Sequence, residues 1–258
     1  MRKMEQGTRA LILLRDMILS GEMAAGQRLR ELALVEQLRI SRTPIRFALG
    51  RLADEGLVES VGGGFTVREF TRQEIREAIR LRGVIEGMAV RFAAERTSPS
   101  DLMPLAWKCI DELDEVLKGR SIDQKHIERY LDINRRFHKY LSDLSDSFVV
   151  QRTLNHVCAL PFASPNAFVM AQRGVGDIRE TIFIAQQQHR SILEAIENRD
   201  GGRAEALARE HAELSLTAMR RVLQAPDHAD LVPGLKLLRE TSDANEPVSA
   251  EPEVGGPA

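Results

Sequence analysis

The sequence predicts a mostly α-helical protein with a small β-hairpin near its N-terminus. Apolar residues recur at the three- and four-residue spacing of buried helix faces from Thr8 to Leu223. The clearest exception is a pair of short apolar runs joined by three consecutive glycines, a pattern typical of two strands and a turn. We therefore expect an N-terminal domain in residues 1–70 and an all-helical bundle in residues 71–224.

The composition is that of a globular protein rather than a membrane or disulfide-stabilised one. The chain has 258 residues, of which 43% are hydrophobic and 29% charged, and no run of 18 apolar residues occurs. Arg15 and Asp16 interrupt the first apolar stretch, so we expect no signal peptide. Two cysteines, Cys109 and Cys158, provide no disulfide framework, which favours a cytoplasmic location.

Charge is unevenly distributed along the chain. Residues 1–72 contain 12 basic and 9 acidic residues, whereas residues 225–258 contain 2 and 7, so the net charge of -2 conceals a basic head and an acidic tail. Between Glu36 and Asp54 there are four arginines and no acid. The tail is rich in Pro and Gly and lacks a helical stripe, so we expect residues 225–258 to be disordered.

Local signals in the N-terminal domain define three helices and the hairpin. Ser41 is a suitable N-cap for the third helix, and Pro44 is tolerated in its first turn because the backbone donors there lack intrahelical partners. Gly56 ends that helix. The other expected elements are helices at residues 8–19 and 30–38 and strands at residues 58–61 and 65–67. Together they make a winged helix-turn-helix.

In such a domain the helix after Ser41 lies in the major groove of DNA. Arg42 and Arg46 are four residues apart and share one face, where each could bond bidentately to guanine and discriminate by about 1–3 kcal/mol. Thr43 and the helix N-terminus would bind phosphates, and Gly63 would let the hairpin approach the DNA backbone. Ser41, the N-cap, is a further candidate DNA-binding residue. A solvated basic helix face is the alternative, but the spacing, N-cap and hairpin together favour DNA binding.

Three histidines lie on otherwise apolar helix faces of the bundle. They are His138 in residues 123–144, with Asn134 one turn before it, His189 in residues 177–198 and His211 in residues 203–223. A buried polar group without a partner costs about 1–3 kcal/mol, so a shared partner explains this placement. Three imidazoles and a side-chain oxygen suit a divalent metal, with zinc first and nickel or manganese as alternatives. The remaining histidines, His126, His156 and His228, show no such placement.

The motif SRTPIR..L.RL..EGLV, followed by the glycine-rich hairpin, resembles the GntR family of bacterial transcription regulators over roughly residues 6–70. Two positions depart from the family pattern. Phe47 stands where the family usually has Glu, and Leu32 lies near the position of a basic residue with which some members contact DNA. The resemblance implies DNA binding but does not imply a particular operator sequence.

The segments NRRFH, HRSILEAIENRD and REH are similar to the FCD effector domain of the FadR-type branch of that family, over roughly residues 72–223. This resemblance implies a metal held by an acidic or amide residue, a histidine four positions later and two further histidines. The matching positions are Asn134, His138, His189 and His211. It also implies dimerisation through this domain and a small carboxylic acid as effector.

Asn134 is neutral where relatives carry Asp. The four ligands would therefore bring no charge, and the ion would keep its full positive field in a low-dielectric site. We expect stronger attraction of an anionic effector and weaker resting metal affinity than with Asp.

A capping box from Thr71 to Glu74 begins the first helix of the bundle. Its expected inward-facing residues are Ile75, Ile79, Ile85, Met88 and Phe92. On this helix Arg82 precedes Glu86 by four residues, a spacing that predicts an ion pair along the helix. The family resemblance offers a second interpretation, in which Arg82 binds the carboxylate of the effector.

These observations together predict a dimeric, ligand-responsive repressor that binds a roughly palindromic operator, each subunit contributing one winged helix. One alternative is a metal-dependent hydrolase that uses the three histidines to activate water. Another is a DNA-binding protein whose histidines form only a hydrogen-bonded core. The sequence indicates neither the effector nor the operator.

Overall fold

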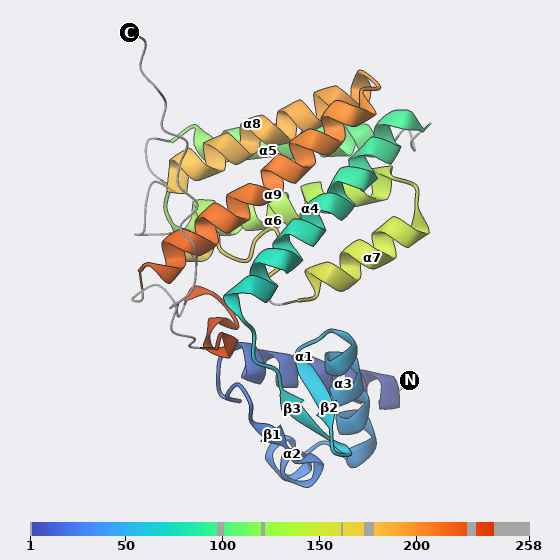
Figure 1. Cartoon of the computed structure of the whole chain (residues 1–258), viewed down its shortest axis with the longest axis vertical. Helices are drawn as coiled ribbons and strands as arrows, with labels where there is room; N and C mark the ends of the chain where they lie inside the picture. The colour runs from blue at the N-terminus through green and yellow to red at the C-terminus, as the bar shows by residue number, and fades with distance from the viewer. Residues whose placement is uncertain are drawn as a thin grey trace.

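The computed structural model of the chain describes residues 2–96, 101–119, 122–160, 162–172, 178–225 and 231–239. Within these ranges a small N-terminal domain adjoins one end of a helical bundle (Figure 1). This confirms the predicted mostly α-helical fold. None of the helices in the described ranges combines the length and apolar character needed to cross a membrane.

The N-terminal domain is the predicted winged helix-turn-helix with one additional strand. Its elements are α1 (Arg2–Leu19), β1 (Arg28–Leu29), α2 (Glu31–Leu38), α3 (Arg42–Asp54), β2 (Val58–Val61) and β3 (Gly64–Val67). The strands form an antiparallel sheet in the order β1-β3-β2. The sequence did not predict β1, because two residues are too few to show an alternating pattern.

Backbone conformation explains the tight passage from α2 to α3. Arg39 adopts a left-handed conformation with φ 53°, which ends α2 and redirects the chain. Ser41 occupies the N-cap position of α3, although its side chain makes no capping hydrogen bond among the described residues. Ile45 and Leu49 are fully buried and belong to the core shared with α1, so the opposite face of α3 points outward. Gly56, with φ 75°, follows the end of α3 as predicted.

The bundle contains α4 (Arg72–Glu95), α5 (Leu102–Leu117), α6 (Gln124–Leu144), α7 (Phe148–Cys158), α8 (Ile178–Glu197) and α9 (Gly201–Leu223). The predicted capping box begins α4, with hydrogen bonds in both directions between Thr71 and Glu74. Burial alone would raise the pKa of the Glu74 carboxyl. Hydrogen bonds from Thr71 and from Arg68 outweigh burial and lower that pKa.

The inward face of α4 differs from the predicted one beyond Ile79. Met88 is 45% exposed and Ile85 is only partly buried, whereas Arg82, Gly83, Glu86 and Gly87 are buried. The glycines explain the difference. A Cβ atom on Gly83 would lie 2.7 Å from the Cβ of Ala212, so α4 and α9 pack closely enough to require a residue without a side chain. The apolar stripe therefore indicated the wrong face.

Part of the tail departs from the expectation of disorder. Residues 231–239 lie against the junction between the two domains, where Figure 1 draws them in red. Their 3₁₀ turn, Leu235–Leu237, follows Gly234, whose φ is 84°. Leu237 is fully buried in the core shared by α1, α4 and α9. The expectation for residues 226–230 and 240–258 lies outside the described residues.

Candidate metal centre and DNA-binding surface

Three histidines from three helices meet inside the bundle. His138 on α6, His189 on α8 and His211 on α9 are 7%, 0% and 8% exposed. A potential ligand atom of each lies within 4.8 Å of the others, and their ring centroids are separated by 5.6, 5.3 and 4.5 Å. The helical periodicity that predicted inward-facing imidazoles thus corresponds to one cluster in space.

Hydrogen bonds behind the rings leave ring nitrogens facing the cluster. The Nδ1 atom of His138 lies 2.9 Å from Glu86 Oε1, and Nδ1 of His211 lies 2.9 Å from Gln188 Oε1. The Nε2 atom of His138 is buried without a partner among the described residues, and Nε2 of His189 and of His211 are 3.1 Å apart. An oxygen behind the imidazole, as at His138 and His211, is the arrangement that fixes the tautomer of metal-binding histidines. Nδ1 of His189 is buried and has no such partner among the described residues.

Asn134 presents a free oxygen on the same side of α6. Its Nδ2 donates to Asn166 Oδ1 at 2.8 Å, and Nδ2 of Asn166 in turn donates to the carbonyl oxygen of Leu131 at 2.8 Å. This chain fixes the orientation of the Asn134 amide. Its Oδ1 atom is buried and has no hydrogen-bond partner in the described part of the chain. The residues present therefore fit a divalent cation with nitrogen and oxygen ligands.

Electrostatics favours the protonation states that a metal requires. Burial lowers the pKa of His189 far below its ordinary value and lowers that of His211 to about 3, so both imidazoles are neutral. Burial alone would raise the pKa of Glu86. The charges of His138 and Arg82, with the hydrogen bond from His138, outweigh burial and lower it to about 2. The neutral imidazoles of His189 and His211 can bind a cation without first releasing protons.

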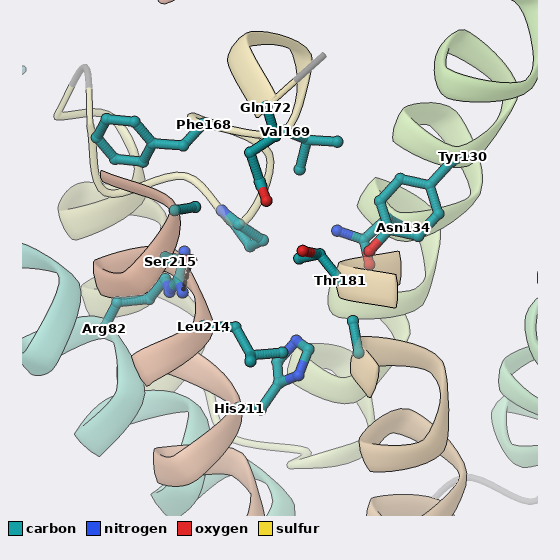
Figure 2. A pocket seen from close by; sticks show the side chains of 13 residues that line it. Arg82, Tyr130, Asn134, Phe168, Val169, Gln172, Thr181, His211, Leu214 and Ser215 are labelled. Carbon is teal, nitrogen blue, oxygen red and sulfur yellow. Dashed lines mark hydrogen bonds between the residues drawn. The ribbon is translucent and has the colours of Figure 1, made fainter. Parts of the chain in front are cut away.

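A small cavity of about 40 Å³ opens beside this cluster. Figure 2 shows side chains from several segments pointing into it, with Asn134, Gln172 and His211 on different sides. The Oε1 atom of Gln172 is buried without a partner among the described residues. A volume of this size holds roughly three water-sized atoms, so it suits a small polar molecule.

Arg82 forms the ion pair predicted from the sequence and also lines the cavity. Its side chain is 1% exposed and lies 3.4 Å from Glu86, forming the predicted ion pair along α4. Its guanidinium also lines the cavity and donates to the carbonyl oxygen of Ala163 at 2.8 Å and to Ser215 Oγ at 3.0 Å. In the sequence, Glu86 is recognisable only as a partner of Arg82, four residues before it. The contact with His138 joins residues 52 positions apart, so no local pattern indicated it.

The candidate DNA-binding residues lie on the exposed face of α3. Ser41, Thr43, Arg42 and Arg46 are all exposed, the last two with 63% and 65% of their side chains. Both guanidinium groups contact Glu31 at the start of α2, at 2.6 Å for Arg42 and 3.3 Å for Arg46. The acid-free stretch in the sequence is thus neutralised in part by a carboxylate from another helix.

The hairpin tip and Phe47 complete this surface. Gly63 has φ 72° at the exposed tip between β2 and β3, a conformation that favours glycine. Arg28 on β1 donates to the carbonyl oxygen of Gly62 at 3.4 Å, which places a further cation beside the tip. Phe47, which departs from the family pattern, lies on Gly7, where a Cβ atom would be 2.8 Å from its ring. The aromatic ring therefore packs on α1.

Comparison with known proteins identifies both domains. Residues 8–67 match the bacterial regulatory proteins of the gntR family, and residues 77–214 match the FCD domain. The uncharacterised HTH-type transcriptional regulator YdhC of Bacillus subtilis is 26% identical over 213 residues, covering 82% of this chain and 89% of that protein. The HTH-type transcriptional repressor RspR of Escherichia coli is 24% identical over 221 residues, covering 83% and 88%. The structure of E. coli McbR/YncC is 23% identical, covers 85% of this chain and 97% of that one, and has a TM-score of 0.57.

These matches decide the class of the protein. The FCD match alone spans more than half of the chain, and the relatives are transcription regulators. Because the matched family and the relatives are transcription regulators, the chain is not an enzyme and the hydrolase alternative is rejected. The chain belongs to the gntR family of bacterial regulatory proteins and is a DNA-binding transcription regulator with a C-terminal FCD domain.

Proposed function

We propose that this protein is a repressor whose affinity for its operator depends on a divalent metal and a small carboxylate in the bundle. The observation that carries the proposal is the meeting of three buried imidazoles, with the unpartnered amide oxygen of Asn134 one turn before His138 on α6. Relatives that include a named repressor support the direction of regulation. The cytoplasm is the proposed location, since that is where a bacterial regulator meets its operator DNA.

Zinc is the proposed ion, because imidazole nitrogens with one oxygen suit it, and nickel or manganese are the alternatives. Asn134, His138, His189 and His211 would hold the ion, while Glu86 and Gln188 orient two of the imidazoles. When bound, the metal would supply a positive field that attracts an anion. As ligands all four side chains would be neutral, and among the described residues the carboxylate of Glu86, behind His138, would offset part of the charge of the ion.

A small carboxylic acid is the proposed effector. The buried guanidinium of Arg82 lines the cavity on one side and His211 of the cluster lies on another, so with a metal bound an anion there would lie between the guanidinium and the ion. Ser215 Oγ, which accepts from Arg82 at 3.0 Å, has a hydroxyl hydrogen that it can donate to an anion in the same cavity. The volume of about 40 Å³ favours an acid of few heavy atoms.

A homodimer is the proposed form that binds DNA, since a palindromic operator requires two reading heads. Three large apolar residues are exposed on α4, the helix that follows the winged helix directly. They are Leu81, Val84 and Met88, at 51%, 40% and 45% exposure. Their spacing puts them on one face of the helix, and a second copy of the chain would bury that face.

Sedimentation tests this interface. The Met88→Glu variant should sediment as a monomer, whereas the matched control Leu105→Glu, at an exposed residue of α5, should still sediment as a dimer. Equal sedimentation would contradict this interface.

The metal proposal is tested by elemental analysis and calorimetry on the purified protein. We expect one ion per chain, with binding lost in His189→Ala. A protein that contains no metal and gives no heat with zinc, nickel or manganese would leave the alternative of a purely hydrogen-bonded core.

A further inference from the structure

The C-terminal residues 231–239 form a second connection between the two domains. Gly234 donates its backbone N–H to the carbonyl oxygen of Leu19, the last residue of α1, at 2.8 Å. The backbone of Phe70, just before α4, accepts from the N–H of Arg239 and donates to the carbonyl oxygen of Leu237, both at 2.8 Å. Phe70 and Leu238 form a parallel β-bridge.

Apolar side chains of the same segment are buried in the junction. Val232, Leu235 and Leu237 belong to one core with residues of α1, α4 and α9. The stem of Lys236 covers Gly21, where a Cβ atom would meet Lys236 Cδ, and Gly21 has φ 80°. This contact attaches the segment to the loop that follows α1.

A single covalent linker leaves neighbouring domains free to rotate unless a substantial apolar interface holds them. Here the linker between β3 and α4 is joined by this second, hydrogen-bonded and buried connection. The same chain continues from α9, which carries His211 and Ser215 on the cavity side and contributes Met219 and Val222 to the junction core. The helix that carries a metal-site histidine and the segment that contacts α1 therefore share one apolar core.

We propose that residues 231–239 act as a strap that sets the angle between the winged helix and the bundle and transmits the state of the metal centre to the DNA-binding helix. The regulatory half, transmission of the state of the metal centre, rests on the proposed function. The mechanical half, setting the angle between the domains, does not. Disrupting the strap should free the angle between domains without removing the metal ligands.

The test measures the distance distribution between spin labels at Glu36→Cys on α2 and Asn198→Cys beyond α8, in the full chain. Both positions are exposed. Burial raises the pKa of the native Cys158 thiol to about 12, and Cys109 is buried, so the introduced thiols react selectively. Leu237→Asp should broaden the distribution about twofold, as expected for release of a hinge. Leu231→Asp, at an exposed leucine of the same segment, is the matched control and should leave it unchanged.

Arg239→Pro is a milder variant that removes one backbone donor at an exposed residue, and it decides the question if Leu237→Asp does not fold. It should broaden the distribution to an intermediate extent. An unchanged width in the folded variants would overturn the strap.

Operator affinity with and without zinc plus acetate then tests the regulatory half. In the unmodified chain, zinc plus acetate should change operator affinity by about 5–150-fold. In the strap variants the same additions should change it by less than about twofold. Coupling that persists in a variant with a broadened distribution would overturn the transmission role. No coupling in the unmodified chain would count against the proposed function, while the label distances still decide the strap.

Discussion

Asn134→Asp tests the metal centre most informatively, because it changes charge with almost no change in shape. The amide Nδ2 donates to Asn166 Oδ1, and Asn166 cannot rotate its own amide to compensate without losing its bond to Leu131. In the metal-free variant the introduced carboxylate and Asn166 Oδ1 therefore face each other as two acceptors, with no hydrogen between them. We expect its free energy of unfolding to fall by about 1–3 kcal/mol.

With metal present, the effect of the substitution on stability reverses. A carboxylate at this position would attract the cation directly, so zinc affinity should rise and the stability of the loaded variant should recover. A second carboxylate from the effector would then meet a like charge. At roughly 4 Å and an effective dielectric constant near 20, that repulsion is about 4 kcal/mol before the ion screens it, so acetate affinity should fall at least tenfold.

Calorimetric titration with zinc and then acetate measures both affinities, and thermal unfolding of the metal-free protein measures the stability. Asn198→Asp, an exposed change of the same chemistry beyond the end of α8, is the control and should alter none of the three. Unchanged zinc and acetate affinities in Asn134→Asp would refute the assignment of this residue as a ligand.

Further predictions concern DNA binding and pH. Arg42→Ala and Arg46→Ala should each reduce the preference for operator over random DNA by about 1–3 kcal/mol and leave weak general binding, as measured by fluorescence anisotropy; equal losses on both DNAs would contradict base contacts. Glu31→Gln should tighten binding to random DNA and steepen its salt dependence, because it frees both guanidinium groups, while Glu36→Gln on the same helix should not reproduce the gain in affinity. The pKa of Glu74 is lower in the folded protein than its unfolded value of 4.5. Its ionised carboxylate therefore stabilises the fold above pH 4.5, and this stabilisation is lost as pH falls through the folded pKa. Glu74→Gln should weaken the fall in unfolding free energy at acid pH, and an unaltered fall would argue against this contribution.

Local patterns were sufficient to predict the winged helix and the histidine cluster. Ser41, Pro44, Gly56 and the glycine tip act within a few residues, so each marks an element boundary without tertiary information. The histidines could be placed because helical periodicity orients a residue relative to its own helix, and a polar residue on an apolar face is conspicuous.

Contacts between distant segments could not be predicted in this way. Glu31 neutralises arginines on the next helix, and Glu86 hydrogen-bonds a histidine on α6, while both look like ordinary surface acids in the sequence. On α4 the apolar stripe was wrong beyond Ile79, because close packing selects Gly83 rather than a large side chain. The strap escaped detection for a similar reason, since its few apolar residues stand in an acidic, Pro- and Gly-rich tail.

The central claim is that an ion held by the bundle controls a DNA-binding helix in the other domain. Its most direct test is the affinity of one operator for the metal-free protein, for the zinc-loaded protein and for the zinc-loaded protein with acetate. We predict that these affinities differ by about 5–150-fold between states and that His189→Ala abolishes the difference. Identical affinities in all three states, with zinc shown to be bound, would contradict the account.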